Sequence, residues 1–417
     1  MDMNANVWEA IERLRAQSRE PVCAYLYDLA GIQAHVREMR RVMPDGTGLF
    51  YAIKANPDRR IIESLLPLVD GFEVASAGEL LKVREVCENV RVLFGGPGKK
   101  EAELELALRH NVTYIHVESL LELRRIIRLA QGRSRPVRIL LRINLRTAAL
   151  PQTKIAMGGR PAPFGLDELL IEEAIGIIRE EGRGAVRLGG FHFHSLSNNL
   201  RAELHAEMIE LYLLKAEEWA ERYNLDLEIV NAGGGFGVSY DAAPAFDWPL
   251  FTSLIARSAA RKRLPGVRLW FEPGRLIVAE HGYYAAEVVD IKISHDQHFA
   301  VLRGGTHHNR LPASWGHNHP FVIMPTGRWE HPFARPEVRH GKVTLVGELC
   351  TPKDRLHADA EVECLRVGDI VVFEKSGAYC WTISHHDFLG HPHPEFYYLT
   401  EGNGHAHIDN RVRPESG

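Results

Sequence analysis

The chain has 417 residues, of which 45% are hydrophobic and 25% are charged, a balance typical of folded globular proteins. Its 50 lysines and arginines and 54 aspartates and glutamates give a formal net charge of −4, which disfavours nucleic acid as a partner. No apolar run reaches the roughly 18 residues of a membrane span, and residues 1–20 do not resemble a signal peptide. Five scattered cysteines without CxxC spacing indicate reduced thiols. We therefore expect a cytoplasmic enzyme of two or three domains that binds neither nucleic acid nor membranes.

Short apolar runs alternate with segments of helical period from about residue 25 to 280, such as 77–88, 118–131 and 202–223. Eight such strand–helix units in about 250 residues are typical of a (β/α)8 TIM barrel. The alternative is a doubly wound sheet, but that fold carries a glycine-rich turn after its first strand, where this chain has Lys54. The eight predicted strands are 49–56, 71–77, 90–96, 113–119, 137–145, 188–195, 227–234 and 268–275.

The pattern changes after residue 281, where short alternating runs and turn residues replace the long helical periods. We therefore expect an α/β chain with a barrel over residues 25–280 and a C-terminal antiparallel β-barrel or sandwich domain over residues 281–417. The strand-like run VCAYLYD suggests that residues 1–24 complete the second domain. The tail after Gly402 is polar, and we expect it to pack loosely.

Polar residues follow most of the predicted barrel strands, at the end where barrels carry their active sites. Any one of them is unremarkable alone, since a lone lysine is usually solvated and a lone histidine usually structural. Their occurrence on most of the strands together indicates a functional site. The residues are Lys54, Asn56, Glu73, Ser76, Arg142, Asn144, His192, His194, Ser197, Gly233–Gly237 and Glu272–Arg275.

Three of these features suggest a cofactor. Lys54 at a barrel mouth would be partly desolvated, which lowers the pKa of a lysine towards that of a nucleophilic amine. The glycines at 233–237 let backbone N–H groups approach a phosphate, although a tight loop without a ligand is an alternative. Glu272 is a carboxylate that could meet a heterocycle nitrogen. Together they indicate a site for pyridoxal 5′-phosphate (PLP).

Seven ordered motifs resemble those of the fold-type III PLP-dependent decarboxylases, which act on diaminopimelate, ornithine and arginine. They are YAIKAN, GFEVASAGEL, HFHSLSNN, NAGGGFG, EPGR, GELCTPKD and SGAY. The segments IAMGGRPAPFG, LRGGTHHNRLP and SHHDFLGHPHPEFYYLT are similar to the branch that serves staphyloferrin B-type siderophore pathways. This resemblance implies a head-to-tail homodimer with shared sites. It also implies decarboxylation of citryl-L-2,3-diaminopropionate to citryl-ethylenediamine.

The resemblance also implies roles for individual residues. Lys54 would hold PLP covalently and later move a proton, and His194 would stack on the cofactor ring. Cys350 would enter the site from the partner subunit, as an acid or a gate. Glu272 would bind the protonated pyridine nitrogen, with Glu73 and Arg142 orienting the group. The phosphate would be held by Ser197, Gly234, Gly235, Phe236, Gly237, Gly274, Arg275 and Tyr379.

The departures from the family pattern concern the substrate. After Cys350 the chain reads Thr351-Pro352-Lys353-Asp354, with Lys353 where relatives place a carboxylate, and Arg303 stands where they commonly have aspartate. Cations near the mouth suit a small anionic substrate with a carboxylate-bearing tail, although solvated loop charges are the alternative. The predicted substrate-binding residues are Arg310, Thr351, Lys353, Asp354 and His386.

Other functions are possible on this pattern. The five His pairs show no metal-ligand spacing, and no metal is expected. A decarboxylase of carrier-protein-bound amino acids would need a basic patch for an acidic carrier. Diaminopimelate decarboxylase is disfavoured by Lys353. A non-catalytic PLP-binding protein would lack Cys350 and a C-terminal β domain, and a racemase would need a tyrosine base opposite Lys54.

Overall fold

The computed structural model describes residues 5–146, 161–327, 329–400 and 407–409. The chain divides into two compact units. One comprises residues 33–238 and 244–277, and the other comprises residues 1–32, 239–243 and 278–417. Residues 155–160 of the motif IAMGGRPAPFG and nearly all of the tail after Gly402 lie outside the described residues.

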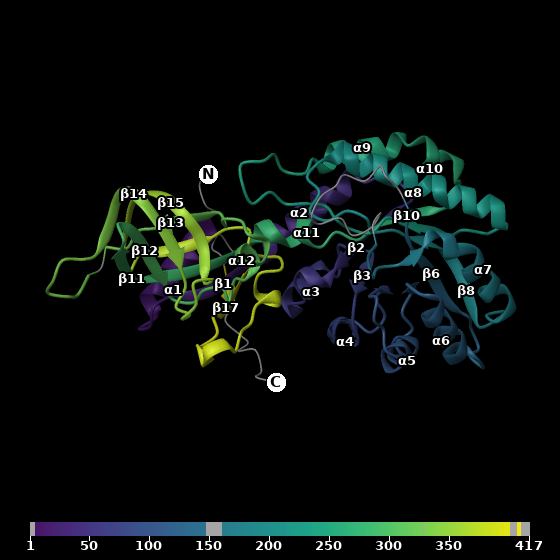
Figure 1. Cartoon of the computed structure of the whole chain (residues 1–417), viewed down its shortest axis with the longest axis horizontal. Coiled ribbons are helices and arrows are strands. Elements are labelled where there is room, and N and C mark those ends of the chain that lie inside the picture. The colour runs from purple at the N-terminus through teal and green to yellow at the C-terminus, as the bar shows by residue number, and fades with distance from the viewer. Residues whose placement is uncertain (1–4, 147–160, 328, 401–406, 410–417) are drawn as a thin grey trace. The chain divides into compact units, whose positions relative to one another are not determined.

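The first unit is a closed barrel of eight parallel strands, in which β2 pairs with both β3 and β10 and β5 pairs with β6 to close the ring. All eight predicted strands and the predicted barrel are confirmed. Figure 1 shows helices such as α4, α6 and α8 on the outside of these strands. The barrel strands are β2 (Thr47–Ala52), β3 (Gly71–Val74), β4 (Val92–Phe94), β5 (Tyr114–Val117), β6 (Val137–Asn144), β8 (Val186–His192), β9 (Ile229–Asn231) and β10 (Arg268–Phe271).

The remaining elements from Leu29 to Val278 are mostly the helices that connect these strands. A two-residue strand, β7 (Leu166–Asp167), pairs with the end of β6. The helices are α2 (Leu29–Arg41), α3 (Arg59–Leu65), α4 (Ala77–Val86), α5 (Glu101–Arg109), α6 (Leu120–Ala130), α7 (Ile171–Glu180), α8 (Ala202–Tyr223), α9 (Trp248–Arg257), α10 (Ala259–Arg263) and α11 (Arg275–Val278).

The barrel interior is filled by side chains from alternate strand positions. One fully buried cluster comprises Phe50, Leu93, Tyr114, Leu140, Ile229 and Trp270, so that β2, β4, β5, β6, β9 and β10 share one core layer. Caps start the helices soon after the strands end. Ser76 accepts from the N–H of Glu79 at 3.2 Å and Ser119 from that of Glu122 at 3.0 Å. The chain therefore turns sharply at the carboxyl ends of β3 and β5, where polar residues begin.

The second unit is a nine-stranded sheet built on a long central strand, β11 (Gly282–Ser294). The expected β domain is confirmed, but its sheet is mixed rather than antiparallel throughout. β1 (Cys23–Asp28) runs parallel to β17 (Glu395–Thr400), and β12 (Gln297–Leu302) runs parallel to β14 (Glu337–Val346). The other elements are α1 (Ala5–Gln17), α12 (Leu311–Trp315), β13 (Phe321–Met324), β15 (Arg355–Arg366), β16 (Ile370–Phe373) and β18 (His407–Asp409).

The N-terminal segment belongs to the core of this second unit. Helix α1 buries Val7, Ala10, Ile11 and Leu14, spaced as one face of a helix, against β1, β11, β16 and β17. Strand β1 pairs with both β11 and β17, so this strand of the second unit runs to Asp28, past the boundary at residue 24 that the sequence suggested. Among the helices of the described residues, none is long and apolar enough to cross a membrane.

Candidate active site

Lys54 lies one turn beyond β2, in a short helical turn from Ile53 to Ala55 rather than in the strand itself. Its Nζ atom is 3.0 Å from Oε2 of Glu73, which lies on the neighbouring strand β3. The Lys54 side chain is 39% exposed, whereas that of Glu73 is 5% exposed. Burial raises the pKa of Glu73, and the charge of Lys54 opposes this shift. A buried carboxylate therefore orients an accessible amine at the barrel mouth.

Glu272 follows β10 directly and is surrounded by three side chains, one from the adjacent strand β9 and two from the more distant strands β8 and β5. Asn231 donates to Oε1 at 2.6 Å, and the Nε2 atom of His192 lies 3.2 Å from Oε2. The Nε2 atom of His116 lies 3.7 Å from Oε1. Burial lowers the pKa of both imidazoles well below the ordinary value, so both rings are neutral. With its proton on Nε2, His192 donates to the carboxylate, whereas the Nε2 atom of His116 lies 3.5 Å from Nδ2 of Asn231, an amide nitrogen that only donates.

His116, His192 and Glu272 are also the group among the described residues whose ligand atoms lie close enough together for a metal ion. The two imidazoles are stacked, with ring centroids 4.1 Å apart and an interplanar angle of 14°. The Nε2 lone pair of a histidine lies in its ring plane, so two nearly parallel rings do not converge on one ion. The geometry therefore indicates that the two histidines position Glu272 and do not bind a metal ion.

The glycine segment after β9 packs against backbone from three directions. A Cβ atom at Gly234 would lie 2.4 Å from the carbonyl oxygen of Glu272, and one at Gly235 would lie 2.3 Å from that of Leu196. Gly235 also has a φ of +91°, which other residues rarely adopt. In the described part of the chain, the amides of Gly235 and Phe236 have no hydrogen-bond acceptor. Two adjacent free N–H groups on a tight glycine turn fit a phosphate.

His194 lies beside this glycine segment. Its Nδ1 atom accepts a hydrogen bond from the amide of Gly234 at 3.1 Å, which places any proton of the ring on Nε2. Burial lowers the pKa of His194 well below the ordinary value, and the charge of Lys54 lowers it further. His194 is therefore a neutral ring fixed against the glycine turn, as a residue that stacks on a cofactor requires.

Arg142 belongs to a buried network behind the mouth. Its Nη1 atom is 2.8 Å from Oε1 of Glu118, which also accepts from the amides of Gly96 and Gly165. Lys99 donates to Glu122 at 2.8 Å and to two backbone carbonyls. These charges are paired and their hydrogen bonds are made within the barrel, so the network holds Arg142 rigidly at the end of β6.

The remaining predicted phosphate residues of the barrel are placed as follows. Arg275 begins α11 and is 7% exposed. Gly274 packs on β2, since a Cβ atom there would lie 2.9 Å from the carbonyl oxygen of Ala52. Ser197 lies in the loop after β8, near the bridge that pairs Asn199 with Phe236. The barrel therefore gathers lysine, carboxylates, imidazole and a glycine turn at its carboxyl end, and this set fits PLP.

Phe236 anchors the glycine turn in an aromatic cluster. Its ring stacks on that of His205 with centroids 4.1 Å apart and an interplanar angle of 7°, and Phe246, Phe251 and Trp248 pack edge-on against it. His205 is 2% exposed, and burial lowers its pKa to about 3. The glycine turn is thus held in place through the stacking of Phe236 on a neutral histidine.

This histidine makes the stability of the fold depend on pH. The folded-state pKa of His205 is depressed, so its contribution is present above the unfolded pKa of about 6.5 and is lost as the pH falls towards about 3. We expect His205→Phe to narrow the difference in the free energy of unfolding between pH 7 and pH 5 by about 2 kcal/mol. Urea unfolding of the wild type and of His205→Phe at pH 7 and pH 5 measures this difference in the free energy of unfolding. An unchanged difference would show that His205 takes up a proton in the folded state.

The other predicted residues lie in the β unit. Cys350 is exposed, and Tyr379 adopts a φ of +57°. Arg310, Thr351 and Lys353 line one cavity. Asp354 is buried, and its carboxylate accepts from the amide and hydroxyl of Thr306 and from the amide of Leu349. Those hydrogen bonds tie Asp354 into its own loop.

His386 packs on Trp381, with ring centroids 3.5 Å apart, and its Nε2 atom is 2.6 Å from the Trp381 carbonyl oxygen. Burial lowers its pKa. Its Nε2 atom is therefore committed to the Trp381 backbone, and the Nδ1 atom is the one that remains for other contacts.

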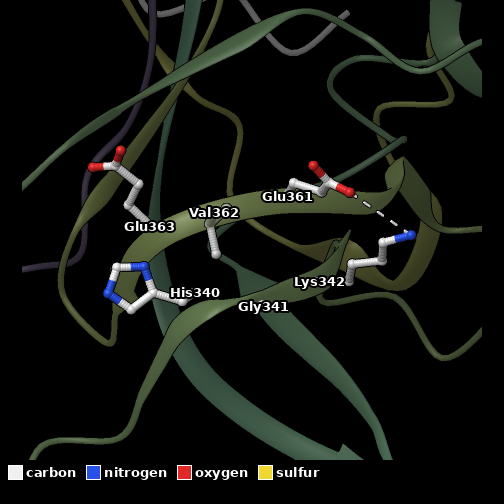
Figure 2. Close-up of a pocket in the computed structure, with 6 residues that line it drawn as sticks. All are labelled: His340, Gly341, Lys342, Glu361, Val362 and Glu363. Atoms are coloured by element: carbon white, nitrogen blue, oxygen red, sulfur yellow. Dashed lines mark ion pairs between the residues drawn. The ribbon is translucent and has the colours of Figure 1, made fainter.

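A different hollow of the β unit, on the ladder between β14 and β15, contains none of the predicted site residues (Figure 2). Lys342 and Glu361 face each other there across the strands, with Nζ and Oε1 3.8 Å apart. Both side chains are largely exposed. Charges of opposite sign that pair in water on regular strands are typical of a solvated face.

Comparisons with known proteins agree with this site. Residues 29–279 match the family described as pyridoxal-dependent decarboxylase, pyridoxal binding domain. The chain is 42% identical over 396 residues to 2-((L-alanin-3-ylcarbamoyl)methyl)-2-hydroxybutanedioate decarboxylase of Staphylococcus aureus, covering 95% of this chain and 98% of that protein. It is 33% identical to the L-glutamyl BtrI acyl-carrier protein decarboxylase of Niallia circulans, covering 89% and 87%. The structure of Helicobacter pylori diaminopimelate decarboxylase complexed with L-lysine has a TM-score of 0.82 at 25% identity, covering 95% of both chains.

Proposed function

Because the chain belongs to the family of pyridoxal-dependent decarboxylases, we propose that it converts citryl-L-2,3-diaminopropionate to citryl-ethylenediamine in a siderophore pathway of the staphyloferrin B type. The name of the Staphylococcus aureus relative describes this substrate, a citryl group joined by an amide to the side-chain amine of diaminopropionate. The observation that carries the proposal is 42% identity to that relative across 95% of the chain.

Decarboxylation needs an acceptor for the electron pair that remains when carbon dioxide leaves. PLP, when bound, supplies a ring that accepts this pair as long as its pyridine nitrogen is protonated. Glu272 provides the carboxylate for that nitrogen, and Asn231 and His192 hold its two oxygens at 2.6 Å and 3.2 Å. The buried carboxylate would stabilise the protonated nitrogen, because the attraction between opposite charges is stronger where water is excluded.

The other barrel residues bind the cofactor and move a proton. Lys54 would hold the cofactor covalently and would deliver the proton that replaces the lost carboxylate at Cα. His194 would stack on the ring, and Glu73 and Arg142 fix Lys54 and its surroundings. The phosphate would be held by Ser197, Gly234, Gly235, Phe236, Gly237, Gly274 and Arg275 of the barrel and by Tyr379 of the β unit.

The β unit completes the site in an assembly of two chains. We assign a head-to-tail homodimer in the cytoplasm, in which Cys350 enters the site from the partner subunit and acts near Cα. The exposure of Cys350 within its own chain is consistent with a role at such an interface. Arg310, Thr351, Lys353, Asp354 and His386 are the candidate substrate residues of this unit, with Asp354 contributing through the loop that it braces.

A substrate comparison tests the function. Purified holoenzyme is given citryl-diaminopropionate, diaminopimelate, ornithine or a carrier-bound glutamate, and carbon dioxide release is followed. We expect kcat/KM for the citryl substrate to exceed that for the others by at least about 100-fold, because a site built for a polar group rejects analogues without it. Turnover of diaminopimelate alone, or of the carrier-bound substrate alone, would contradict the assignment. Absence of release from all four would favour a non-catalytic PLP-binding protein.

A further inference from the structure

The β unit contains a cavity of about 750 Å³ that the barrel chemistry does not use. It lies among α12, the first residues of β15 and the loop from Thr351 to Lys353. Its volume falls in the range of small-molecule sites. Its lining residues include five with basic side chains, Arg310, His317, Lys353, Arg355 and His385.

The permanently charged side chains that line this cavity form no ion pair within the described residues. Arg310, Lys353 and Arg355 have no carboxylate within ion-pair distance in the part of the chain that the structure describes. None of the described lining residues is acidic. Other arginines of the unit are paired, such as Arg335 with Asp369 at 3.1 Å. Three exposed cations around one hollow, each without a carboxylate partner among the described residues, are available to bind an anion.

The loop between β14 and β15 contains two acidic residues, and neither lines the cavity. Glu348 pairs with Arg303 at 2.6 Å. Asp354 stands between Lys353 and Arg355 in sequence, but it is 2% exposed. Its oxygens accept from Thr306 at 2.6 and 2.7 Å and from the amide of Leu349 at 2.8 Å. These hydrogen bonds hold the Asp354 carboxylate away from the cavity lining, whereas the side chains of its neighbours Lys353 and Arg355 line the cavity.

The imidazole beside Arg310 adds a neutral donor. The Nη1 atom of Arg310 lies 2.9 Å from Nδ1 of His385, and since a guanidinium only donates, Nδ1 must be the acceptor. Burial lowers the pKa of His385, and the charge of Arg310 lowers it further. His385 therefore carries its proton on Nε2 and steadies the Arg310 fork. A planar, oriented guanidinium matches a carboxylate with two hydrogen bonds.

We propose that this cavity binds a small polycarboxylate, and that its occupant during catalysis is the citryl end of the substrate. The second part rests on the proposed function. Arg310, Lys353 and Arg355 engage the carboxylates, and Pro312, Pro352 and Leu356 contact the carbon chain between them. Arg355 and His385 were not distinguished by the sequence pattern, and they extend the predicted substrate residues into one site.

Citrate binding to the holoenzyme tests the site directly. Isothermal titration calorimetry with citrate is compared for the wild type, the double variant Lys353→Gln/Arg355→Gln and the conservative variant Arg355→Lys. We expect the double variant to weaken binding about 100-fold, since each charge-assisted contact contributes about tenfold, and Arg355→Lys to weaken it less. Lys342→Gln is the matched control, because Lys342 lies in the same unit opposite Glu361 and should not alter binding. Equal citrate affinity in the wild type and the double variant would overturn the proposal.

Kinetics separate this inference from the function on which it partly rests. With citryl-diaminopropionate, the double variant should raise KM by about 100-fold and leave kcat within about threefold, because uniform binding is lost. If the wild type turns over no citryl substrate but citrate binding still depends on Lys353 and Arg355, the function fails and the polycarboxylate site stands. If citryl turnover is normal and KM is unchanged in the double variant, the site fails and the function stands. If the double variant lost the ability to bind an acyl-carrier protein but kept its citrate affinity, the polycarboxylate site would also be overturned.

Discussion

Replacing Lys54 with alanine is expected to lower the rate of carbon dioxide release at least about 10³-fold and to abolish covalent attachment of the cofactor. Lys54 is the accessible amine of the barrel mouth, held 3.0 Å from Glu73. The measurement is the intact mass after borohydride reduction. The wild type should gain one pyridoxyl phosphate group, located on the peptide that contains Lys54, and Lys54→Ala should gain none.

A second substitution at Lys54 and a comparison with Lys99 make this result specific. Lys54→Arg keeps a cation beside Glu73 but cannot attach the cofactor, so it should behave like Lys54→Ala in mass and in rate. The other lysine close to the barrel site, Lys99, already donates to Glu122 and to the carbonyls of Gly96 and His116. Attachment to Lys99 in the wild type, or a normal rate in Lys54→Ala, would show that the cofactor is held elsewhere.

Glu272→Gln is expected to lower kcat by about 10²- to 10³-fold while cofactor binding persists. An amide does not hold a pyridine nitrogen in its protonated form, and it presents an N–H group to donors that were arranged for a carboxylate. Asn231 and His192 would then face a mismatched partner at 2.6 Å or 3.2 Å. The readouts are kcat and the pH dependence of the visible absorbance of the bound cofactor.

A variant of Asn231, which contacts Glu272, provides a comparison for the expected loss of kcat in Glu272→Gln. Asn231→Ala removes one hydrogen bond to Glu272 but keeps the carboxylate, and we expect a loss of about tenfold in kcat. If Glu272→Gln and Asn231→Ala have the same small effect, and the absorbance of the cofactor is unchanged, then Glu272 does not control the pyridine nitrogen.

The barrel was predictable because its signal is local. Each strand is a short apolar run ending in polar residues, and all eight runs form strands in the structure. The observed strands stop earlier than predicted, as β2 does at Ala52, because the backbone turns where the site residues begin. The parallel pairing of β1 with β17 was not predictable, since it joins residues about 370 positions apart and leaves no periodic trace.

The site residues also divide into those that the local sequence predicts and those that only contacts between distant strands reveal. Lys54, Glu73 and Glu272 stand at strand ends in recognisable motifs, whereas His116 and Asn231 lie within buried strands and look like isolated polar residues in apolar runs. Their role depends on contact with Glu272, which follows a different strand. Asp354 is the opposite case, because its place in the motif predicts a substrate residue, whereas its burial and its bond from the Leu349 amide are visible only in the structure.

The pairing of β1 between β11 and β17 bears on the order in which the nascent chain acquires its structure. Residues 23–28 leave the ribosome well before their partner strands at 282–294 and 395–400. The intervening barrel strands pair with one another and can fold beforehand. Until the last strand is released, the apolar faces of α1 and β1 lack their native cover. Chaperones that shield exposed apolar segments therefore have their longest period of action at the amino-terminal end of this chain.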